Sequence, residues 1–264
     1  MLASVSTRSP KDTYITVYGR KPVLEALADP TLAVDKVIVA DTMCGAMLGE
    51  IHSAARRREV PVQRASAHRV KVLAGNGRHD QGVLADVVAR RMRPITEFLD
   101  ALPREAACAV LVLDAVTNPA NVGMVLRTAT AAGLDGVLLP RRGVPAIDPL
   151  VIKASAGVAF RAPVLRAASA AEGCAALREA GVTVLGLTSD AACSLLRDPL
   201  PTRVALVLGN ETDGLSGEVR AELDGTIAIP MHGGVESLNV ASAAAIASYE
   251  LLRRRSGDVP APTP

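Results

Sequence analysis

The second half of the chain carries five short hydrophobic runs, and segments with helical spacing of apolar residues separate them. Such runs are typical of strands that are buried on both faces of a parallel sheet. The pattern predicts an α/β domain that ends with an Ala-rich helix at about Asn239–Arg254. The expected strands are Ala109–Leu113, Gly136–Leu139, Val182–Leu187, Val204–Leu208 and Ile227–Ile229.

The residues before this domain alternate between helix and strand patterns on a smaller scale. Apolar residues at helical spacing around Val23 and Leu27 predict a helix, and the β-rich run Val34–Ala40 predicts a strand. A basic helix at about Met47–Arg58 and a short strand at Val60–Gln63 follow. These patterns predict a small α/β unit in front of the larger one.

Changes in composition divide the chain into five segments. Residues 1–11 are polar and residues 256–264 contain three prolines, so both ends are expected to be disordered. Residues 90–106 hold two prolines and a short amphipathic piece, and are interpreted as a linker. The expected domains are residues 12–89 and residues 107–255.

Positive charge is concentrated in the first domain. The whole chain has a formal net charge of only +2, yet residues 51–93 contain ten Lys or Arg and three acidic residues. A basic surface suits RNA phosphates, whereas five aromatic residues and no Trp argue against binding by base stacking. The alternative is an ordinary solvated face. The expected RNA-binding residues are Arg20, Arg56, Arg57, Arg58, Arg64 and Arg78.

Other protein classes lack support in the sequence. The four cysteines are far apart in apolar or small-residue contexts, which indicates reduced, buried thiols. The four histidines lack ligand spacing, so no metal site is expected. No stretch reaches the roughly 20 apolar residues that span a bilayer, and the N-terminus has no apolar signal region, which predicts a cytoplasmic protein.

Three segments of the second domain place polar residues where a strand ends. They are DAVTNPANVGMVLRT at 114–128, LVLGNETDGLS at 206–216 and IPMHGGVESLNVASA at 229–243. Open α/β sheets bind their ligands at such strand ends. Each segment also has a plain structural explanation, because Asn and Ser cap helices and Gly forms turns. The dinucleotide motif GxGxxG and the phosphate loop GxxxxGK[ST] are both missing, so nothing supports NAD or ATP.

In their order and spacing, these segments resemble the signature motifs of the SpoU (TrmH-like) family of SPOUT RNA 2′-O-ribose methyltransferases. The resemblance covers about Cys108–Arg254 and includes KASAGVAFRAPV at 153–164. The front part, with YGRKPVLEAL and HDQGVLADV, is similar to the L30e-like substrate-binding domain of members that modify 23S ribosomal RNA. The resemblance implies an S-adenosylmethionine-dependent enzyme that methylates a ribose 2′-hydroxyl of 23S rRNA.

The resemblance also implies a deep trefoil knot and a homodimer with active sites at the subunit interface. Carried over by motif, the residues around the reacting ribose would be Asn121, Arg127, Glu211, Ser237 and Asn239. The cofactor would contact Leu208, Gly209, Asn210, Ile229, Met231, Ser237 and Leu238. Because a guanidinium stays protonated, Arg127 is interpreted as a phosphate anchor and alkoxide stabiliser that Glu211 orients.

Three alternatives stay open at this point. They are a transfer RNA ribose methyltransferase of the same fold, an antibiotic-resistance enzyme that methylates 23S rRNA, and a non-catalytic RNA-binding assembly factor. The complete set of motif residues argues against the assembly factor, and the separate front domain argues against a short transfer RNA enzyme. A housekeeping methyltransferase of 23S rRNA and an antibiotic-resistance methyltransferase of 23S rRNA would share these motifs, so both alternatives stay open.

Overall fold

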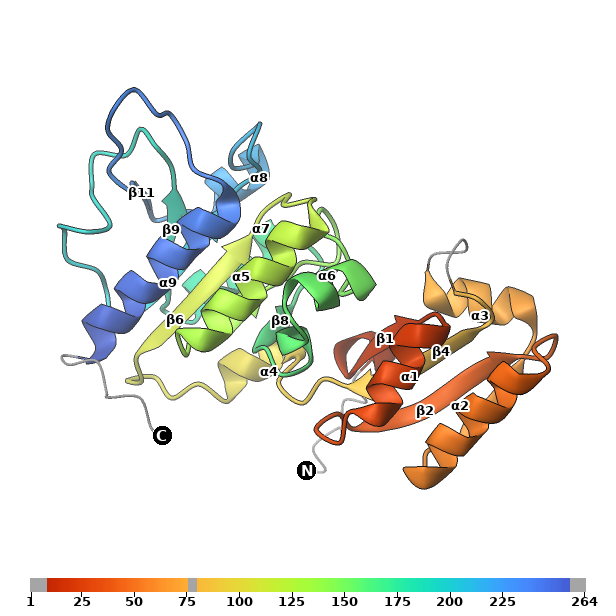
Figure 1. Ribbon diagram of the computed structural model, residues 1–264. Helices are drawn as coiled ribbons and strands as arrows, with labels where there is room; N and C mark the ends of the chain where they lie inside the picture. The colour runs from red at the N-terminus through yellow and green to blue at the C-terminus, as the bar shows by residue number, and fades with distance from the viewer. Residues whose placement is uncertain (1–8, 76–79, 257–264) are drawn as a thin grey trace. The chain divides into compact units, whose positions relative to one another are not determined.

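The computed structural model describes residues 9–75 and 80–256, which form two compact units (Figure 1). One unit comprises the chain up to Arg90, and the other comprises the chain from Arg91 onward, apart from the short segment Ile147–Pro149. Most of both expected disordered ends lies outside the described residues. No described helix is long and apolar enough to cross a membrane.

Four strands form the sheet of the first unit, in the order β1-β4-β2-β3. The strands β1 and β2 run antiparallel to β4, and β2 runs parallel to β3. The expected strand 34–40 has these bounds, whereas β3 starts two residues later than expected because Val60 closes the turn after α2 by donating to the Ala55 carbonyl. The elements are η1 (Pro10–Asp12), β1 (Tyr14–Tyr18), α1 (Arg20–Ala28), β2 (Val34–Ala40), α2 (Ala46–Arg57), β3 (Val62–Ala65), α3 (Ala67–Ala74) and β4 (Val83–Val88).

Both faces of this sheet are covered. Ile38 of β2 packs with Leu84 of β4 and Val70 of α3 in one buried cluster. Val37 and Val39 point to the opposite face, because side chains alternate along a strand, and they are fully buried as well. The helix α1 contacts β4 and packs against α2.

Seven strands, all paired in parallel, form the sheet of the second unit in the order β11-β9-β10-β6-β7-β8-β5. The expected parallel α/β sheet is therefore confirmed, and four of the five hydrophobic runs form strands. The fifth expected strand, Ile227–Ile229, is wrong in its bounds, because β11 ends at Ile227, where its ladder with β9 ends. The elements are β5 (Arg93–Pro94), α4 (Ile95–Asp100), β6 (Cys108–Leu113), α5 (Pro119–Ala131), β7 (Gly136–Leu138), α6 (Pro149–Ala154), η2 (Val158–Phe160), β8 (Val164–Arg166), α7 (Ala170–Glu179), β9 (Thr183–Leu187), β10 (Arg203–Leu208), α8 (Gly217–Arg220), β11 (Gly225–Ile227) and α9 (Val240–Ser256).

Helices cover both faces of the seven-stranded sheet, which explains why β6 is buried along its whole length. The helices α5 and α9 pack against each other on one face (Figure 1). On the other face, Phe98 of α4, Leu177 of α7 and Val219 of α8 share a core cluster with Val110 and Val207 of the central strands.

The stretch 90–106, expected to be a linker, is structured over much of its length. The strand β5 pairs with β8 at the edge of the sheet. Ile95 and Phe98 stand one turn apart on α4 and are buried in the core of the second unit. This apolar pair gives the short helix a face to bury, and a linker would have none.

The expectation of four buried thiols is wrong for two of them. Cys108 and Cys174 are buried, and burial raises their pKa values to about 11 and about 12. Cys44 and Cys193 are exposed because they lie in the loops that follow β2 and β9. All four are free.

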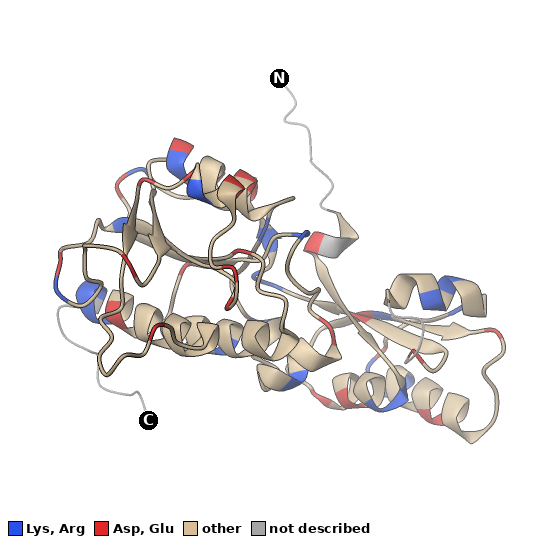
Figure 2. Ribbon diagram, turned by 90° about the horizontal axis from the view of Figure 1, so that it is seen from above, with Lys and Arg blue, Asp and Glu red and all other residues tan. Residues whose placement is uncertain are grey.

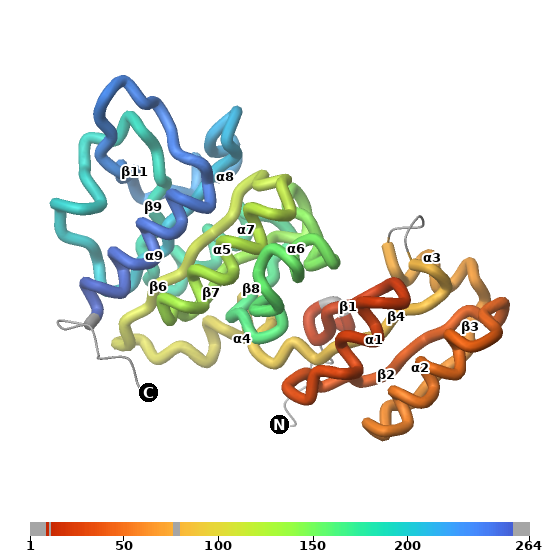
Figure 3. The backbone as a smooth tube through the Cα atoms, viewed as in Figure 1, coloured from red at the N-terminus to blue at the C-terminus, as the bar shows by residue number. Residues whose placement is uncertain are grey.

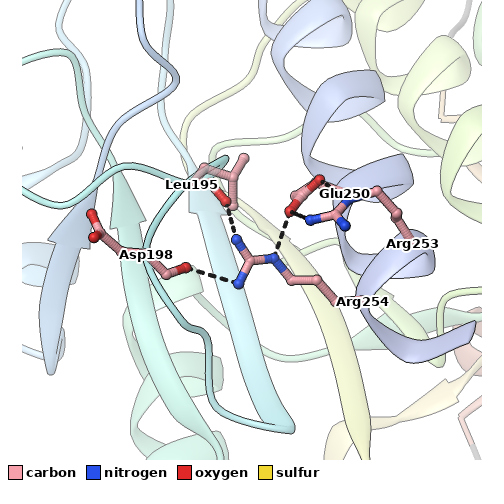
Figure 4. A network of polar contacts seen from close by, with 5 residues as sticks. All are labelled: Leu195, Asp198, Glu250, Arg253 and Arg254. Carbon is pink, nitrogen blue, oxygen red and sulfur yellow. Dashed lines mark hydrogen bonds and ion pairs between the residues drawn. The ribbon is translucent and has the colours of Figure 1, made fainter. Parts of the chain in front are cut away.

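A polar network fixes the end of α9 (Figure 4). The Arg254 guanidinium donates to the backbone oxygens of Leu195 and Asp198, at 2.6 and 2.8 Å, and to the Glu250 carboxylate at 2.6 Å. Arg253 donates to the same carboxylate at 2.7 Å. These bonds, first from Arg253 and then from Arg254, lower the pKa of Glu250 against the opposing effect of burial.

Candidate active site

The three polar segments all begin at the carboxyl edge of the seven-stranded sheet. Leu113 and Leu208 end β6 and β10 and are register partners, so the first two segments leave the sheet side by side. The third segment follows β11, two strands away from β10, and leads into α9. Since α9 packs against α5, the third segment returns to the first.

Hydrogen bonds join the first two segments directly. The buried Asp114 carboxylate accepts from the Ser216 N–H at 2.7 Å, and the Asn210 amide donates to the Ala115 carbonyl at 2.9 Å. The amide oxygen of Asn210 also accepts from the Thr212 N–H at 2.8 Å. Asn210 thus uses both ends of its side chain on backbone groups and shapes the loop that carries Glu211.

Residues from all three segments form one chain of hydrogen bonds. The Asn121 amide nitrogen donates to the Glu211 carboxylate, and the Asn121 amide oxygen accepts from the Asn239 amide nitrogen at 3.2 Å. Asn121 is only 4% exposed. The structure therefore brings together three of the five residues expected around the reacting ribose.

Helix starts position the two asparagines of this chain. Asn118 caps α5 by accepting from the Ala120 N–H at 2.9 Å, which places Asn121 in the first turn. Asn239 caps α9 by accepting from the Ala241 N–H at 2.9 Å. Gly123 lets α6 approach, since a Cβ there would lie 2.6 Å from the Val151 carbonyl oxygen.

Arg127 and Ser237 are exposed side chains that take no part in this chain of hydrogen bonds. Arg127 lies on α5, six residues after Asn121, and forms no hydrogen bond or ion pair within residues 9–75 and 80–256. Glu211 was expected to orient Arg127, but its carboxylate bonds to Asn121 instead. The Arg127 guanidinium is consequently available for a ligand.

A cavity of about 420 Å³ opens next to Glu211. Its volume falls in the range of roughly 300–1,000 Å³ that is usual for small-molecule sites. Residues of the loop after β9 and of the segment before α9 both line it. Figure 3 shows the course of these two parts of the backbone, which are distant in the sequence. All seven residues expected to contact a cofactor line it, namely Leu208, Gly209, Asn210, Ile229, Met231, Ser237 and Leu238.

Sequence reasoning missed other residues of the cavity wall. Thr188 and Asp190 line it from the end of β9, and Arg220 lines it from α8. The Thr188 hydroxyl is buried and has no hydrogen-bond partner among the described residues. The one available signal was position, because Thr188 follows a buried strand as the three recognised segments do.

The basic residues of the first unit differ in what they contact. Arg20, Arg56, Arg57 and Arg64 are exposed, and Figure 2 shows basic residues on the helices of this unit. Arg58 instead donates to three backbone carbonyls, of Leu27, Asp29 and Leu32, at 2.6–3.2 Å. This use leaves Arg58 poorly placed to bind phosphate. Arg78 lies outside the described residues.

Comparison with known proteins assigns both parts of the chain. The profile of the SpoU rRNA Methylase family matches residues 109–249, and the profile for RNA 2′-O ribose methyltransferase substrate binding matches residues 16–93. Two curated relatives are named 23S rRNA (guanosine-2′-O-)-methyltransferase RlmB. The relative from Xanthomonas axonopodis pv. citri is 36% identical, over 91% of this chain and 97% of the relative. The relative from Xylella fastidiosa is 35% identical, over 91% of this chain and 96% of the relative.

A solved structure extends the comparison to three dimensions. The SpoU methyltransferase AviRb from Streptomyces viridochromogenes, in complex with the cofactor AdoMet, superimposes with a TM-score of 0.62. The match has 25% sequence identity and covers 92% of this chain and 90% of that one. The family profile matches more than half of the length of this chain, and the chain therefore belongs to the SpoU rRNA methylase family.

Proposed function

We propose that this protein is an S-adenosylmethionine-dependent methyltransferase that modifies a ribose 2′-hydroxyl in 23S rRNA. The observation that carries the proposal is the cavity beside the Asn121–Glu211–Asn239 chain, since one site then combines a small-molecule pocket with buried polar groups. Relatives named as 23S rRNA guanosine-2′-O-methyltransferases support ribosomal RNA as the substrate.

The cavity wall fits S-adenosylmethionine. Leu208, Ile229 and Leu238 would supply apolar surface for the adenine ring, and polar groups of the Gly209–Thr212 loop would supply partners for the polar parts of the cofactor. The unpartnered Thr188 hydroxyl is a further polar group in this wall. When bound, the cofactor supplies an electrophilic methyl group to the ribose oxygen.

The chain's own residues would hold and orient the ribose. Arg127 forms no hydrogen bond or ion pair with the described residues, so it can anchor an RNA phosphate and stabilise the developing alkoxide. Asn121 and Asn239 are fixed by their mutual hydrogen bond and by Glu211, which reduces the reorganisation needed at the reacting centre. Ser237, on the cavity wall, would contact the ribose, and the proton would pass to another group or to water.

Four finer features of the proposal concern architecture. The second unit would contain a trefoil knot, the first unit would be an L30e-like RNA-binding domain, and the protein would be a homodimer acting in the cytoplasm. Exposed Met124 on α5 and Tyr249 on α9, which are neighbouring helices, support a subunit contact there. Light scattering that gives the mass of a single chain would rule out the dimer.

Substitution of Arg127 tests the catalytic proposal. Arg127→Ala should leave cofactor affinity nearly unchanged and reduce methyl transfer to 23S rRNA by about 100-fold or more, because its contacts matter mainly in the transition state. Arg127→Lys should recover little, because an ammonium lacks the bidentate fork. The measurements are calorimetry with S-adenosylhomocysteine and single-turnover methylation of rRNA.

Arg104→Ala is a matched control, since Arg104 is also exposed but precedes the amino end of β6, at the opposite edge of the sheet. This variant should keep full activity. Full activity in Arg127→Ala would refute the role of Arg127. Failure of the well-folded wild-type protein to bind S-adenosylhomocysteine would refute the proposed function itself.

A further inference from the structure

The charged residues of the cavity wall are unbalanced. Three are acidic, namely Asp190, Glu211 and Glu236, and a single one, Arg220, is basic among the described residues that line the cavity. A ligand that carries an anionic group therefore finds one cationic partner in this wall. Where that group binds depends on how Arg220 is held.

Arg220 is the last residue of α8, and its side chain is anchored at one point. Its Nε donates to the Leu215 carbonyl at 3.1 Å. Its terminal nitrogen lies against the backbone of Gly214, because a Cβ at that glycine would be 3.7 Å from Nη2. Gly214 and Leu215 both line the cavity, so the guanidinium is held at the cavity wall.

The two terminal nitrogens of Arg220 are not committed elsewhere. No described residue forms an ion pair with them, and the side chain is exposed. Many other Arg residues of this unit are engaged: Arg178 pairs with Glu222, and Arg203 bonds to several backbone carbonyls. Arg220 thus presents two parallel donors, the arrangement that matches a carboxylate.

We propose that Arg220 binds the carboxylate of the amino-acid part of S-adenosylmethionine and so selects for the intact cofactor. The cofactor has one carboxylate, and its other charges, an ammonium and a sulfonium, are positive and suit the acidic residues of the wall. The inference rests on the proposed function, because it assigns one end of the cofactor within that site. Arg220 is then a specificity-determining residue that no motif of the sequence marks.

The test compares two ligands that differ in the carboxylate alone. Wild-type protein should bind S-adenosylmethionine roughly tenfold more tightly than decarboxylated S-adenosylmethionine in calorimetry, the size expected for a solvent-screened bidentate contact. Arg220→Ala should bind both ligands with similar affinity, equal to that of wild type for the decarboxylated ligand. Arg220→Lys should restore part of the preference. Arg197→Ala, which removes an exposed Arg outside the cavity wall, should keep all of it.

The other outcomes separate the possible errors. Equal weakening of both ligands in Arg220→Ala would mean that the loop at Gly214 has been distorted, and an unchanged preference would mean that the carboxylate lies elsewhere; either result overturns the proposal. Weaker rRNA binding with an unchanged ligand preference would assign Arg220 to an RNA phosphate. If wild type binds neither ligand, the proposed function fails before this inference is reached.

Discussion

Asn121 occupies a position in which both ends of its amide are specified. Its nitrogen faces a carboxylate that only accepts, and its oxygen faces an amide nitrogen that only donates. Neither Asp nor a rotated amide satisfies this pair of partners. The buried position therefore requires Asn, and it fixes two other site residues from different segments.

Asn121→Ala should reduce the rate of methyl transfer by about 100-fold, because Glu211 and Asn239 lose their shared partner and the site becomes misaligned. Asn121→Asp should be at least as inactive at neutral pH, since it sets a second carboxylate against Glu211. Single-turnover kinetics gives the rate, and calorimetry should show that affinity for S-adenosylhomocysteine changes little. A large loss of cofactor affinity with a normal rate would contradict this positioning role.

Sequence and structure agree that Asn121, Glu211 and Asn239 lie together, and they differ on what Glu211 contacts. The motif resemblance predicted Asn121, Glu211 and Asn239 together, and it predicted the residues of the cavity wall from β10 and β11. It did not predict that Asn210 bonds to Ala115, because a side-chain partner 95 positions away depends on how two loops meet. Arg220 lies outside the three motif segments, and its place in the cavity wall likewise depends on how the loops meet.

At the scale of elements, the C-terminal helix shows what a charge pattern predicts. The last turn of α9 contains Arg253, Arg254 and Arg255, and cations at a helix C-terminus interact favourably with the helix dipole. In the structure each has a specific partner: Arg253 and Arg254 share Glu250, and Arg255 pairs with Asp135. The pattern predicted the position and sign of the charges, and tertiary contacts supplied the partners.

Arg254→Ala should lower the free energy of unfolding by roughly 2–3 kcal/mol, because it leaves a largely buried carboxylate with one partner and two carbonyls with none. Arg253→Ala, at a side chain that is 63% exposed, should cost less. Denaturant unfolding of both variants provides the comparison. A larger loss in Arg253→Ala would show that the carbonyl contacts of Arg254 contribute little.

The same network predicts a pH dependence. The folded protein lowers the pKa of Glu250, so the stabilisation is present above the usual Glu pKa of about 4.3 and is lost as pH falls through the lowered value. The difference in Tm between wild type and Arg254→Ala should therefore be largest near neutral pH and shrink in acid. A difference that grows below pH 4 would exclude Glu250 as the titrating group.

Element prediction succeeded for strands that contain a hydrophobic run and failed for β5 and β8, which contain none. The strands β6 and β10 are each a hydrophobic run that is buried on both faces, and such a run predicts a strand from sequence alone. The strand β5 has two residues and β8 has three, so their membership in the sheet depends on tertiary contacts. The two prolines of residues 90–106 favoured a linker, and no hydrophobic run in this stretch indicated β5.

At the scale of the whole molecule, the two units divide the proposed work. The first unit carries exposed Arg56 and Arg57 and matches a substrate-binding profile, and the second contains the cavity. The adjacent Arg58 is occupied by backbone carbonyls. Of the three consecutive arginines, the exposed Arg56 and Arg57 are therefore the two that would make the proposed contact with RNA.

A double substitution of Arg56 and Arg57 by Ala should weaken rRNA binding and reduce the slope of log affinity against log salt by about 2, one unit for each lost phosphate contact. Fluorescence anisotropy across a salt series measures both quantities. Arg58→Ala should instead lower the Tm, with a smaller effect on the salt slope. An unchanged slope in the double variant would identify Arg56 and Arg57 as a solvated face.

The order of strands in the larger sheet has a consequence for synthesis on the ribosome. The strand β10 lies between β6 and β9 in the sheet. Its first residue, Arg203, pairs with Cys108 of β6, which precedes it by 95 positions in the sequence. The first unit pairs its strands within the first 90 residues and can fold while translation continues. The centre of the second sheet has to wait until residue 208 has emerged, so its early strands β6 and β7 spend the intervening time without their neighbour. In a growing chain, the catalytic half is thus the last to form and the most exposed to aggregation.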